Sequence, residues 1–302
     1  MGDLQTEQGE ALELRFVPVS EFARLRASAT DPVARTAAYA ALARINALYM
    51  IAGAWSGHIG TSFSSLEIMS WLFLNEIRDL QAGPECCDIF FSSKGHDAPA
   101  LYAVLLGLGL LPESRMHELR RLGGLPGHPH VETPFVQANT GSLGMGISKA
   151  KGMALANRLR KTPRRIFVLT GDGELLMSMG SLAVVGCARP ANLAIVCVDN
   201  GHYGETGNQD SHTGLGVRLD TVAAGSGIPV VHTINTESEL EEGRRLLREN
   251  GLRFILLRVK EGPPHKKQRN LVPQLLHLDR VCLGDGRGLG AGLGLCVAQL
   301  VR

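Results

Sequence analysis

The sequence predicts an α/β protein built on a doubly wound, mainly parallel sheet. Three short apolar runs rich in β-branched residues alternate with longer helical stretches, an order typical of strands joined by crossover helices. The runs cover residues 165–170, 193–198 and 253–259. Hydrophobic residues make up 44% of the 302 residues, which is enough to bury a sizeable core in one or two domains.

Helices are expected between these strands. The stretch 147–160 predicts a helix before the first run, and a second helix should begin near Glu174, directly after it. Thr236 and Glu239 have the spacing of a capping box, and Gly251 is a stop signal. The sequence therefore predicts one more helix, from Thr236, before the last strand.

The chain divides into three parts. Residues 1–30 are expected to be an extension with little core, residues 31–270 a single ligand-binding domain, and residues 271–302 a glycine-rich tail. Six glycines alternate with other residues over 284–294, and this spacing permits flexibility more readily than a packed helix. We expect no N-terminal leader and no stretch long and apolar enough to span a membrane.

Charge and cysteine content exclude several classes of function. The net charge of +2 is too small to favour nucleic acid as a partner, and the basic run at 266–269 is expected to be a short solvated loop. The six cysteines include an adjacent pair at 86–87 but no Cys-x-x-Cys, so neither a zinc site nor a disulfide framework is indicated. We therefore expect a cytoplasmic protein that acts on a small-molecule substrate, without a nucleic-acid or membrane partner.

Two polar turns follow the first two predicted strands. Gly171-Asp172-Gly173 ends the first strand, and Asn200 and His202 follow the second. If the strands are neighbours, Asp172 and Asn200 lie at one sheet edge and share a small hard cation, with the backbone carbonyl of His202 as a third ligand. The pattern indicates a clamp for magnesium and a diphosphate. The structural alternative is a tight turn in which Asp172 caps the following helix.

Further glycine-rich motifs precede the clamp, and the whole series resembles a known family. Asp172, with Asn200 placed 28 residues later, is similar to the cofactor motif of thiamine diphosphate enzymes. The upstream segments, in their order, resemble the N-terminal half of transketolase, and the resemblance covers about 35–265. These segments are Ser56-Gly57-His58-Ile59-Gly60-Thr61-Ser62, Phe91-Ser92-Ser93-Lys94-Gly95-His96-Asp97-Ala98-Pro99-Ala100-Leu101-Tyr102, Gly127-His128-Pro129 and Thr140-Gly141-Ser142-Leu143-Gly144-Met145-Gly146.

The resemblance implies a thiamine diphosphate-binding fold over 31–270, with thiamine diphosphate and Mg²⁺ as cofactors. It implies that His58, His96 and His128 are catalytic and line the channel over the reactive carbon of the cofactor. Neutral imidazoles move protons on and off hydroxyls and stabilise an alkoxide, as transfer of a two-carbon ketol unit requires. His265 is a weaker candidate. The expected cofactor-binding residues are Gly141, Ser142, Leu143, Gly171, Asp172, Gly173, Glu174, Asn200 and His202, and the metal ligands among them are Asp172, Asn200 and His202.

Two segments near the clamp depart from transketolase. Residues 174–183 and 203–209 look like the diphosphate-binding subunits of 2-oxoacid decarboxylases that act on phosphonopyruvate or sulfopyruvate, although Glu174 follows the transketolase form. A decarboxylase subunit is therefore an alternative to ketol transfer. A non-catalytic homologue is a third reading, but such a scaffold has no physical need for the clamp together with three Gly-His motifs.

The resemblance also implies a partner. Thiamine enzymes activate the cofactor through a glutamate on a second, pyrimidine-binding domain, and we expect no such domain in this chain. We therefore expect a transketolase-like transferase that is one half of a split enzyme. A separate pyrimidine-binding subunit would complete the site, in a heterotetramer by analogy with the family.

Overall fold

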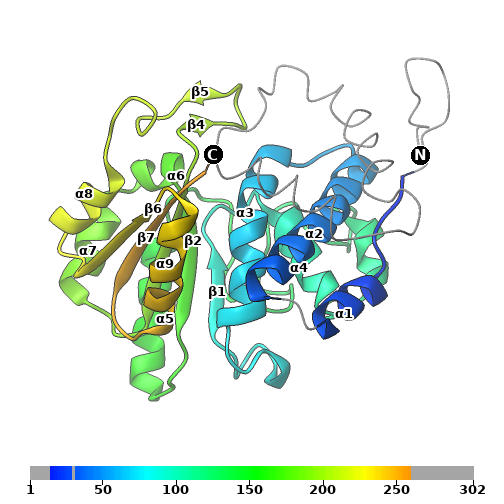
Figure 1. Cartoon of the computed structure of the whole chain (residues 1–302), viewed down its shortest axis with the longest axis horizontal. Helices are drawn as coiled ribbons and strands as arrows, with labels where there is room; N and C mark the ends of the chain where they lie inside the picture. Colours follow the sequence, from blue (N-terminus) through cyan, green and yellow to red (C-terminus); the bar gives the residue numbers. More distant parts are fainter. Residues whose placement is uncertain (1–13, 29–30, 260–302) are drawn as a thin grey trace.

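A five-stranded parallel sheet forms the centre of the protein in the computed structural model, which describes residues 14–28 and 31–259 (Figure 1). The strand order is β1-β2-β3-β7-β6. An antiparallel hairpin, β4 with β5, lies beyond the carboxyl ends of the central strands. The strands are β1 (Ile89–Ser92), β2 (Ile166–Gly171), β3 (Leu193–Asp199), β4 (His202–Tyr203), β5 (Gln209–Asp210), β6 (Val230–Ile234) and β7 (Arg253–Arg258).

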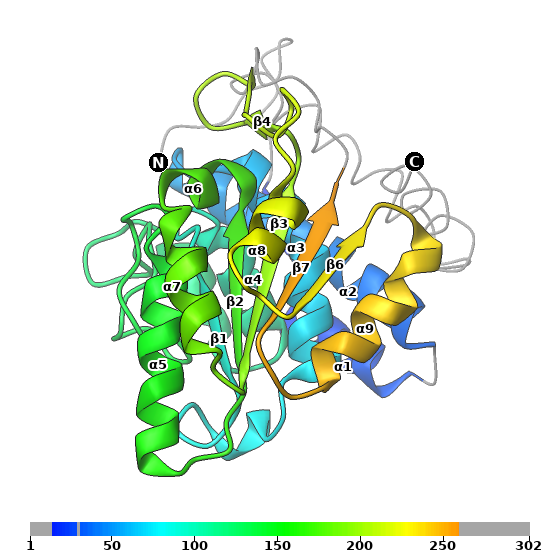
Figure 2. The same cartoon turned by 90° about the vertical axis from the view of Figure 1, so that its left-hand side faces the viewer.

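Helices cover both faces of the sheet. Helices α1 to α4 and α9 lie on one side of the sheet, and α5 to α8 lie on the other (Figure 2). The buried apolar side chains of each group form one hydrophobic cluster with the sheet face that the group covers. The α-helices are α1 (Val19–Ala27), α2 (Pro32–Ala54), α3 (Ile59–Trp71), α4 (Ala98–Gly107), α5 (Gly146–Arg160), α6 (Asp172–Met177), α7 (Gly180–Ala188), α8 (Leu219–Gly225) and α9 (Leu240–Arg248). Shorter turns are the π-helical η1 (Leu72–Glu76) and the 3₁₀ turns η2 (Leu80–Ala82), η3 (Glu113–Glu118) and η4 (Glu237–Glu239).

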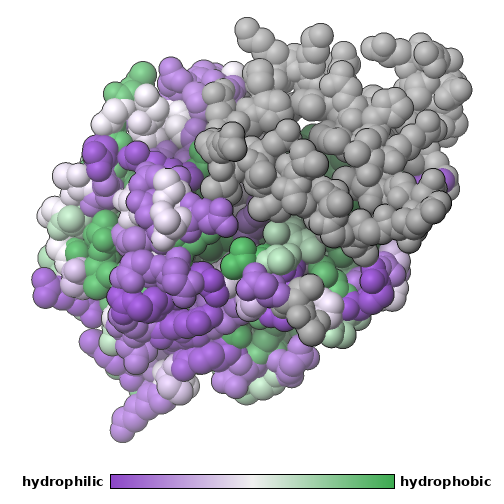
Figure 3. Space-filling model, viewed as in Figure 1, coloured by the Kyte–Doolittle hydropathy of each residue, from purple (hydrophilic) through white to green (hydrophobic). Residues whose placement is uncertain are grey.

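The alternation of side chains along each strand explains why a hydrophobic cluster lies on each face of the sheet. In β2, Phe167 and Leu169 join the cluster on the α2 face, whereas Ile166 and Val168 join the opposite cluster. Successive strand residues point to opposite faces, so a strand covered on both sides must be apolar throughout. The outward side of α9 carries charged residues that pair along the helix, and this part of the surface is hydrophilic in Figure 3.

The predicted fold class is confirmed, and most element boundaries agree within a residue or two. The helix expected over 147–160 begins at Gly146, and the capping box of Thr236 and Glu239 is formed. The helix expected near Glu174 begins earlier, at Asp172. Asp172 does not cap it, because Gly171 is the capping position and the Glu174 carboxylate accepts the Gly171 N–H at 3.1 Å.

The N-terminal extension contributes more core than we expected. Val17 is buried, and its backbone N–H and C=O bond the side-chain amide of Asn46 at 2.7 and 2.9 Å. Phe22 is fully buried, edge-on to Tyr39 with ring centroids 4.9 Å apart. A buried aromatic pair of this kind anchors α1 on α2. The glycine-rich tail, the basic run at 266–269 and His265 lie outside the described residues.

One helix contradicts the expectation that no segment is apolar enough to span a membrane. By length and composition alone, α2 is long and apolar enough to do so. Half of that window is buried inside the fold, where α2 packs against α3 and α4. A core helix passes the same composition test, so this property does not indicate a membrane.

Candidate active site

The clamp residues meet at the carboxyl edge of the sheet. Strands β2 and β3 are parallel neighbours, with Gly171 opposite Val198. Asp172 and Asp199 therefore leave the sheet side by side, and Asn200 follows one residue later, as the sequence predicts. A cleft of about 310 Å³ opens beside Asp199 and Asn200.

The buried carboxyl groups of Asp172 and Asp199 share one hydroxyl partner here. The Thr213 Oγ1 atom lies 2.9 Å from Asp172 Oδ2 and 2.7 Å from Asp199 Oδ1, and Ser211 donates a second hydroxyl to Asp172. The single hydrogen of Thr213 serves only one carboxylate at a time. Burial and the neighbouring Asp172 charge raise the pKa of Asp199, whereas Thr213 opposes this shift. The Arg258 guanidinium lies 3.9 Å from Asp199 Oδ2.

This arrangement fits a small hard cation. The donors are carboxylate and hydroxyl oxygens, which magnesium prefers, and two adjacent buried carboxyl groups gain from a nearby positive charge. Asn200 directs its Oδ1 atom to the His202 N–H at 3.1 Å, and the His202 ring lies 3.2 Å from Asp210. Within the described ranges, no group of three or more His, Cys, Asp or Glu side chains is placed to hold a metal. The three predicted ligands are the Asp172 carboxylate, the Asn200 amide and the His202 backbone carbonyl, and a site of this kind does not require such a group. These ligands therefore stay a prediction.

Gly173 in the clamp and Gly144 in the preceding loop pack too closely against other parts of the chain to carry a side chain. A Cβ atom on Gly173 would lie 2.9 Å from Cδ1 of Tyr203 and closer still to Cε1, so the absence of a side chain lets the β4-β5 hairpin pack on α6. Gly144 has a φ of +77°, and a Cβ there would lie 2.7 Å from the Glu174 carbonyl oxygen. The loop with Gly141, Ser142 and Leu143 therefore lies beside the clamp, with these three residues exposed.

Glu174 and Lys94 lie beneath this edge. One Glu174 oxygen accepts hydrogen bonds from Thr170 and Gly171, and the other is buried without one. Burial raises the pKa of Glu174, partly offset by these hydrogen bonds and by the Lys94 charge. Lys94 is itself buried and donates to Ser65 Oγ at 3.0 Å. Sequence reasoning did not single out Lys94 as a site residue.

The three predicted histidines come together. His58 is the N-cap of α3, His96 follows β1, and His128 lies on a loop before α5. The His58 ring centroid is 5.5 Å from that of His96 and 6.4 Å from that of His128. Their convergence from distant positions in the sequence is what a shared substrate channel requires, although their catalytic part stays a prediction.

Two of these histidines are held neutral. Burial, with a further contribution from the Lys94 charge, lowers the pKa of His96 to about 4. Burial also lowers the pKa of His128, and His58 and Arg120 add to this shift. At neutral pH these imidazoles therefore act as hydrogen-bonding groups without charge.

Glu205 joins the cluster from the hairpin, and sequence reasoning missed it. Its Oε2 atom bonds Nδ1 of His58, and its Oε1 atom accepts the Thr61 N–H at 3.2 Å. Burial alone would raise the pKa of Glu205, but the hydrogen bond and charge of His58 outweigh burial and lower it. The two residues are 147 positions apart, so no local spacing could have paired them.

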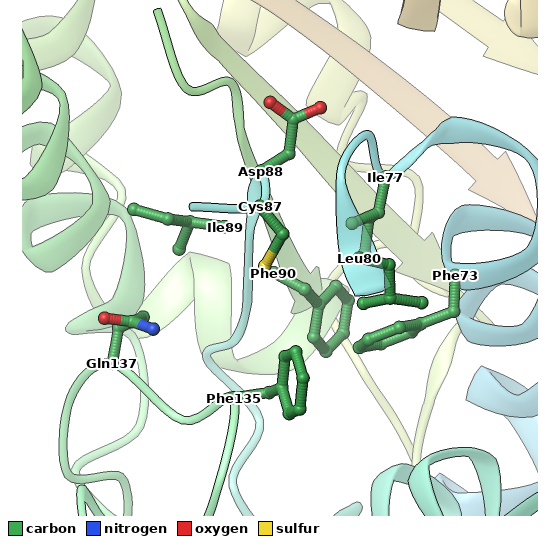
Figure 4. A pocket seen from close by; sticks show the side chains of 9 residues that line it. All are labelled: Phe73, Ile77, Leu80, Cys87, Asp88, Ile89, Phe90, Phe135 and Gln137. Carbon is green, nitrogen blue, oxygen red and sulfur yellow. The ribbon is translucent and has the colours of Figure 1, made fainter. Parts of the chain in front are cut away.

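A second cavity lies away from the site, at the beginning of β1 (Figure 4). Its volume is about 10 Å³, room for no more than one water molecule. It is a packing defect rather than a ligand site. Its lining residues are Phe73, Ile77, Leu80, Cys87, Asp88, Ile89, Phe90, Phe135 and Gln137.

Sequence comparison places these features among known proteins. The transketolase of Pongo abelii is 40% identical over 136 residues, 44% of this chain and 22% of that protein. An apulose-4-phosphate transketolase subunit of Actinobacillus succinogenes is 42% identical over 125 residues, 39% of this chain and 45% of that protein. The sulfopyruvate decarboxylase subunit beta of Methanocaldococcus jannaschii is 34% identical over 131 residues, 43% of this chain and 66% of that protein. The matches thus span less than two thirds of each of these relatives.

Structure comparison agrees on the fold. The transketolase of Campylobacter jejuni superposes with a TM-score of 0.65 and 22% identity, over 76% of this chain and 38% of that one. Residues 35–196 match the family described as transketolase, thiamine diphosphate binding domain. That match spans more than half of the chain and includes the three histidines and Asp172. The protein therefore belongs to the transketolase family of thiamine diphosphate-binding domains.

Proposed function

We propose that this protein is a cytoplasmic, magnesium-dependent subunit of a transketolase-like enzyme that transfers a two-carbon ketol unit between sugar-like substrates. The observation that carries the proposal is the convergence of His58, His96 and His128 in one cluster. Ketol transfer needs several proton movements on substrate hydroxyls. A cluster of imidazoles, two of them neutral, suits that need better than a single acid would.

The chain's own residues would divide the work between binding and proton transfer. Asp172, Asn200 and the His202 carbonyl would hold the metal, and the amides of residues 141–143 would donate to phosphate oxygens. When bound, thiamine diphosphate supplies a carbon that stabilises the transferred unit as a carbanion equivalent. The three histidines would orient substrate hydroxyls and exchange protons with them.

A partner chain belongs to the proposal. The relatives include one protein named as a transketolase subunit and another named as a decarboxylase subunit. By analogy, a separate pyrimidine-binding chain would supply the glutamate that activates the cofactor, in a heterotetramer. The whole enzyme's substrates then depend on side chains of both chains.

Decarboxylation of a 2-oxoacid is the second candidate. It is favoured by the 34% identity to the sulfopyruvate decarboxylase subunit. It is also favoured by the decarboxylase-like segment 203–209, which reaches the histidine cluster through Glu205.

Product analysis separates the two candidates. The chain is purified with its pyrimidine-binding partner, thiamine diphosphate and magnesium, and incubated either with a ketose phosphate and an aldose acceptor or with sulfopyruvate alone. Ketol transfer predicts a new ketose and no carbon dioxide. Carbon dioxide released from sulfopyruvate without an acceptor would replace the transferase assignment with the lyase.

A further inference from the structure

Both carboxylate oxygens of Glu205, in the histidine cluster, are hydrogen-bonded. One oxygen bonds Nδ1 of His58, and the other accepts the Thr61 N–H in the first turn of α3. The positive end of a helix favours a carboxylate there, which agrees with the lowered pKa of Glu205. An ionised carboxylate only accepts hydrogen bonds, so Nδ1 of His58 must carry the hydrogen.

This contact leaves the other ring nitrogen of His58 as an acceptor. With its hydrogen on Nδ1, a neutral imidazole presents a lone pair at Nε2. Within the part of the chain that the structure describes, no hydrogen bond to this Nε2 atom is found. The neighbouring rings are those of His96 and His128, so Nε2 belongs to the proposed substrate channel.

The three histidines are therefore not equivalent. His96 directs Nδ1 to the Lys94 backbone carbonyl, a neutral acceptor, and the buried Lys94 ammonium opposes a positive charge on its ring. His128 has Arg120 as a neighbouring cation. Among these three, His58 is the one with a carboxylate hydrogen-bonded to its ring, and that carboxylate balances the charge of an imidazolium.

Resting on the ketol-transfer function proposed above, we propose that Glu205 is a positioning residue that fixes the Nδ1–H tautomer of His58 and makes His58 the proton acceptor of the cluster. A substrate O–H bond breaks as the Nε2–H bond forms. The proton returns from Nε2 to the product oxygen in the second half of the reaction. The decarboxylase-like hairpin thereby completes a site whose histidines come from the transketolase-like part of the chain.

The structural alternative is that Glu205 only caps α3 through Thr61. Three variants separate the two explanations. Glu205→Gln keeps an acceptor for Nδ1–H but loses the charge, whereas Glu205→Ala loses both. Glu132→Gln is a matched control, because Glu132 lies 3.9 Å from His130 in an exposed pair outside the cluster.

A double-mutant cycle gives the first test, with the partner subunit, cofactor and magnesium present. Turnover should fall about tenfold in Glu205→Gln and about a hundredfold in Glu205→Ala, and Glu132→Gln should match the unmodified protein. In a His58→Ala background, Glu205→Ala should cost less than about twofold, because its effect passes through His58. An equal loss of turnover in both backgrounds would overturn the positioning role.

The tautomer itself gives a second test that needs no activity. Long-range ¹⁵N spectra of the histidine-labelled complex should show the Nδ1–H tautomer of His58, assigned by its loss in His58→Asn. Glu205→Gln should retain this tautomer, and Glu205→Ala should lose it. An Nε2–H tautomer in the unmodified protein would refute the proposal even if ketol transfer is observed. An Nδ1–H tautomer in a complex without ketol transfer would leave the contact standing and refute the proposed function instead.

Discussion

A methyl group added at Gly173 should displace the hairpin that carries Glu205. The new Cβ would lie 2.9 Å from Cδ1 of Tyr203 and closer still to Cε1, whereas ordinary carbon contacts are about 3.5–4.0 Å. The ring therefore has to retreat by about 1 Å to restore such a contact. Overpacking of this kind costs about 1–3 kcal/mol. Alanine regains about 0.5–1 kcal/mol of helix propensity in α6, so the net loss should be about 0–2.5 kcal/mol, whereas the cost relative to a glycine-to-alanine change without overpacking should be about 1–3 kcal/mol.

The matched control is Gly180→Ala. Gly180 also lies in the first turn of a helix, α7, but a Cβ there meets nothing within 4 Å. This variant should be neutral or more stable by up to about 1 kcal/mol. Urea denaturation of both variants, without cofactor, should therefore show a lower midpoint for Gly173→Ala at an unchanged slope.

Tyr203→Ala tests whether the clash with the tyrosine ring causes the loss of stability. In a Tyr203→Ala background the ring is absent, so Gly173→Ala should no longer destabilise the protein. Turnover of Gly173→Ala with the partner should fall by about tenfold or more, because the Glu205 contact to His58 depends on the hairpin position. If Gly173→Ala is as stable as Gly180→Ala, or if Tyr203→Ala does not relieve it, the packing argument is wrong.

Three further predictions concern the clamp, His96 and the partner. Asp172→Ala should abolish the magnesium dependence of thiamine diphosphate binding in calorimetry with the partner present, and unchanged affinity would contradict the clamp. The pKa of His96 is lowered to about 4 in the folded protein. As the pH falls below about 6.5, the His96 imidazole therefore binds a proton in the unfolded chain before it does so in the folded one. The free energy of unfolding should therefore decrease by up to about 3 kcal/mol between about pH 6.5 and 4, and urea denaturation of His96→Asn should show a weaker dependence. The chain purified alone should bind thiamine diphosphate weakly and turn over no ketose donor or 2-oxoacid, whereas activity equal to that of the mixed subunits would exclude the split enzyme.

The sequence predicted the fold well because the strands are apolar on both faces. Each of the runs 165–170, 193–198 and 253–259 became a strand within one residue, and the helix signals at Thr236 and Gly251 lie close to the observed boundaries. The N-terminal segment was harder. Its few apolar residues show no strong periodicity, and the burial of Phe22 depends on Tyr39, which belongs to another helix.

The positions of the candidate site residues could be predicted only where a residue follows the end of a strand or a glycine. Asp172, Asn200 and the three Gly-His motifs carry such local signals. Ser211 and Thr213 do not, because they reach the clamp through the fold of a loop. Lys94 belongs to the motif at residues 91–102, but its burial next to the clamp depends on the pairing of β1 with β2.

Glu205 joins two parts of the chain that the sequence left in conflict. The four motifs within residues 56–146 resemble transketolase, whereas the segment 203–209 resembles decarboxylase subunits, and neither pattern indicates how they meet. In the structure this segment contacts His58, so its glutamate is part of the histidine cluster. A carboxylate at that position adds negative charge to the proposed substrate channel, and a 2-oxoacid anion would bring its own carboxylate close to it. The proposed ketol transfer would bring hydroxyl and carbonyl groups of a sugar to this position instead, so the charge of Glu205 weighs against the decarboxylase alternative even though the segment that carries it resembles decarboxylase subunits.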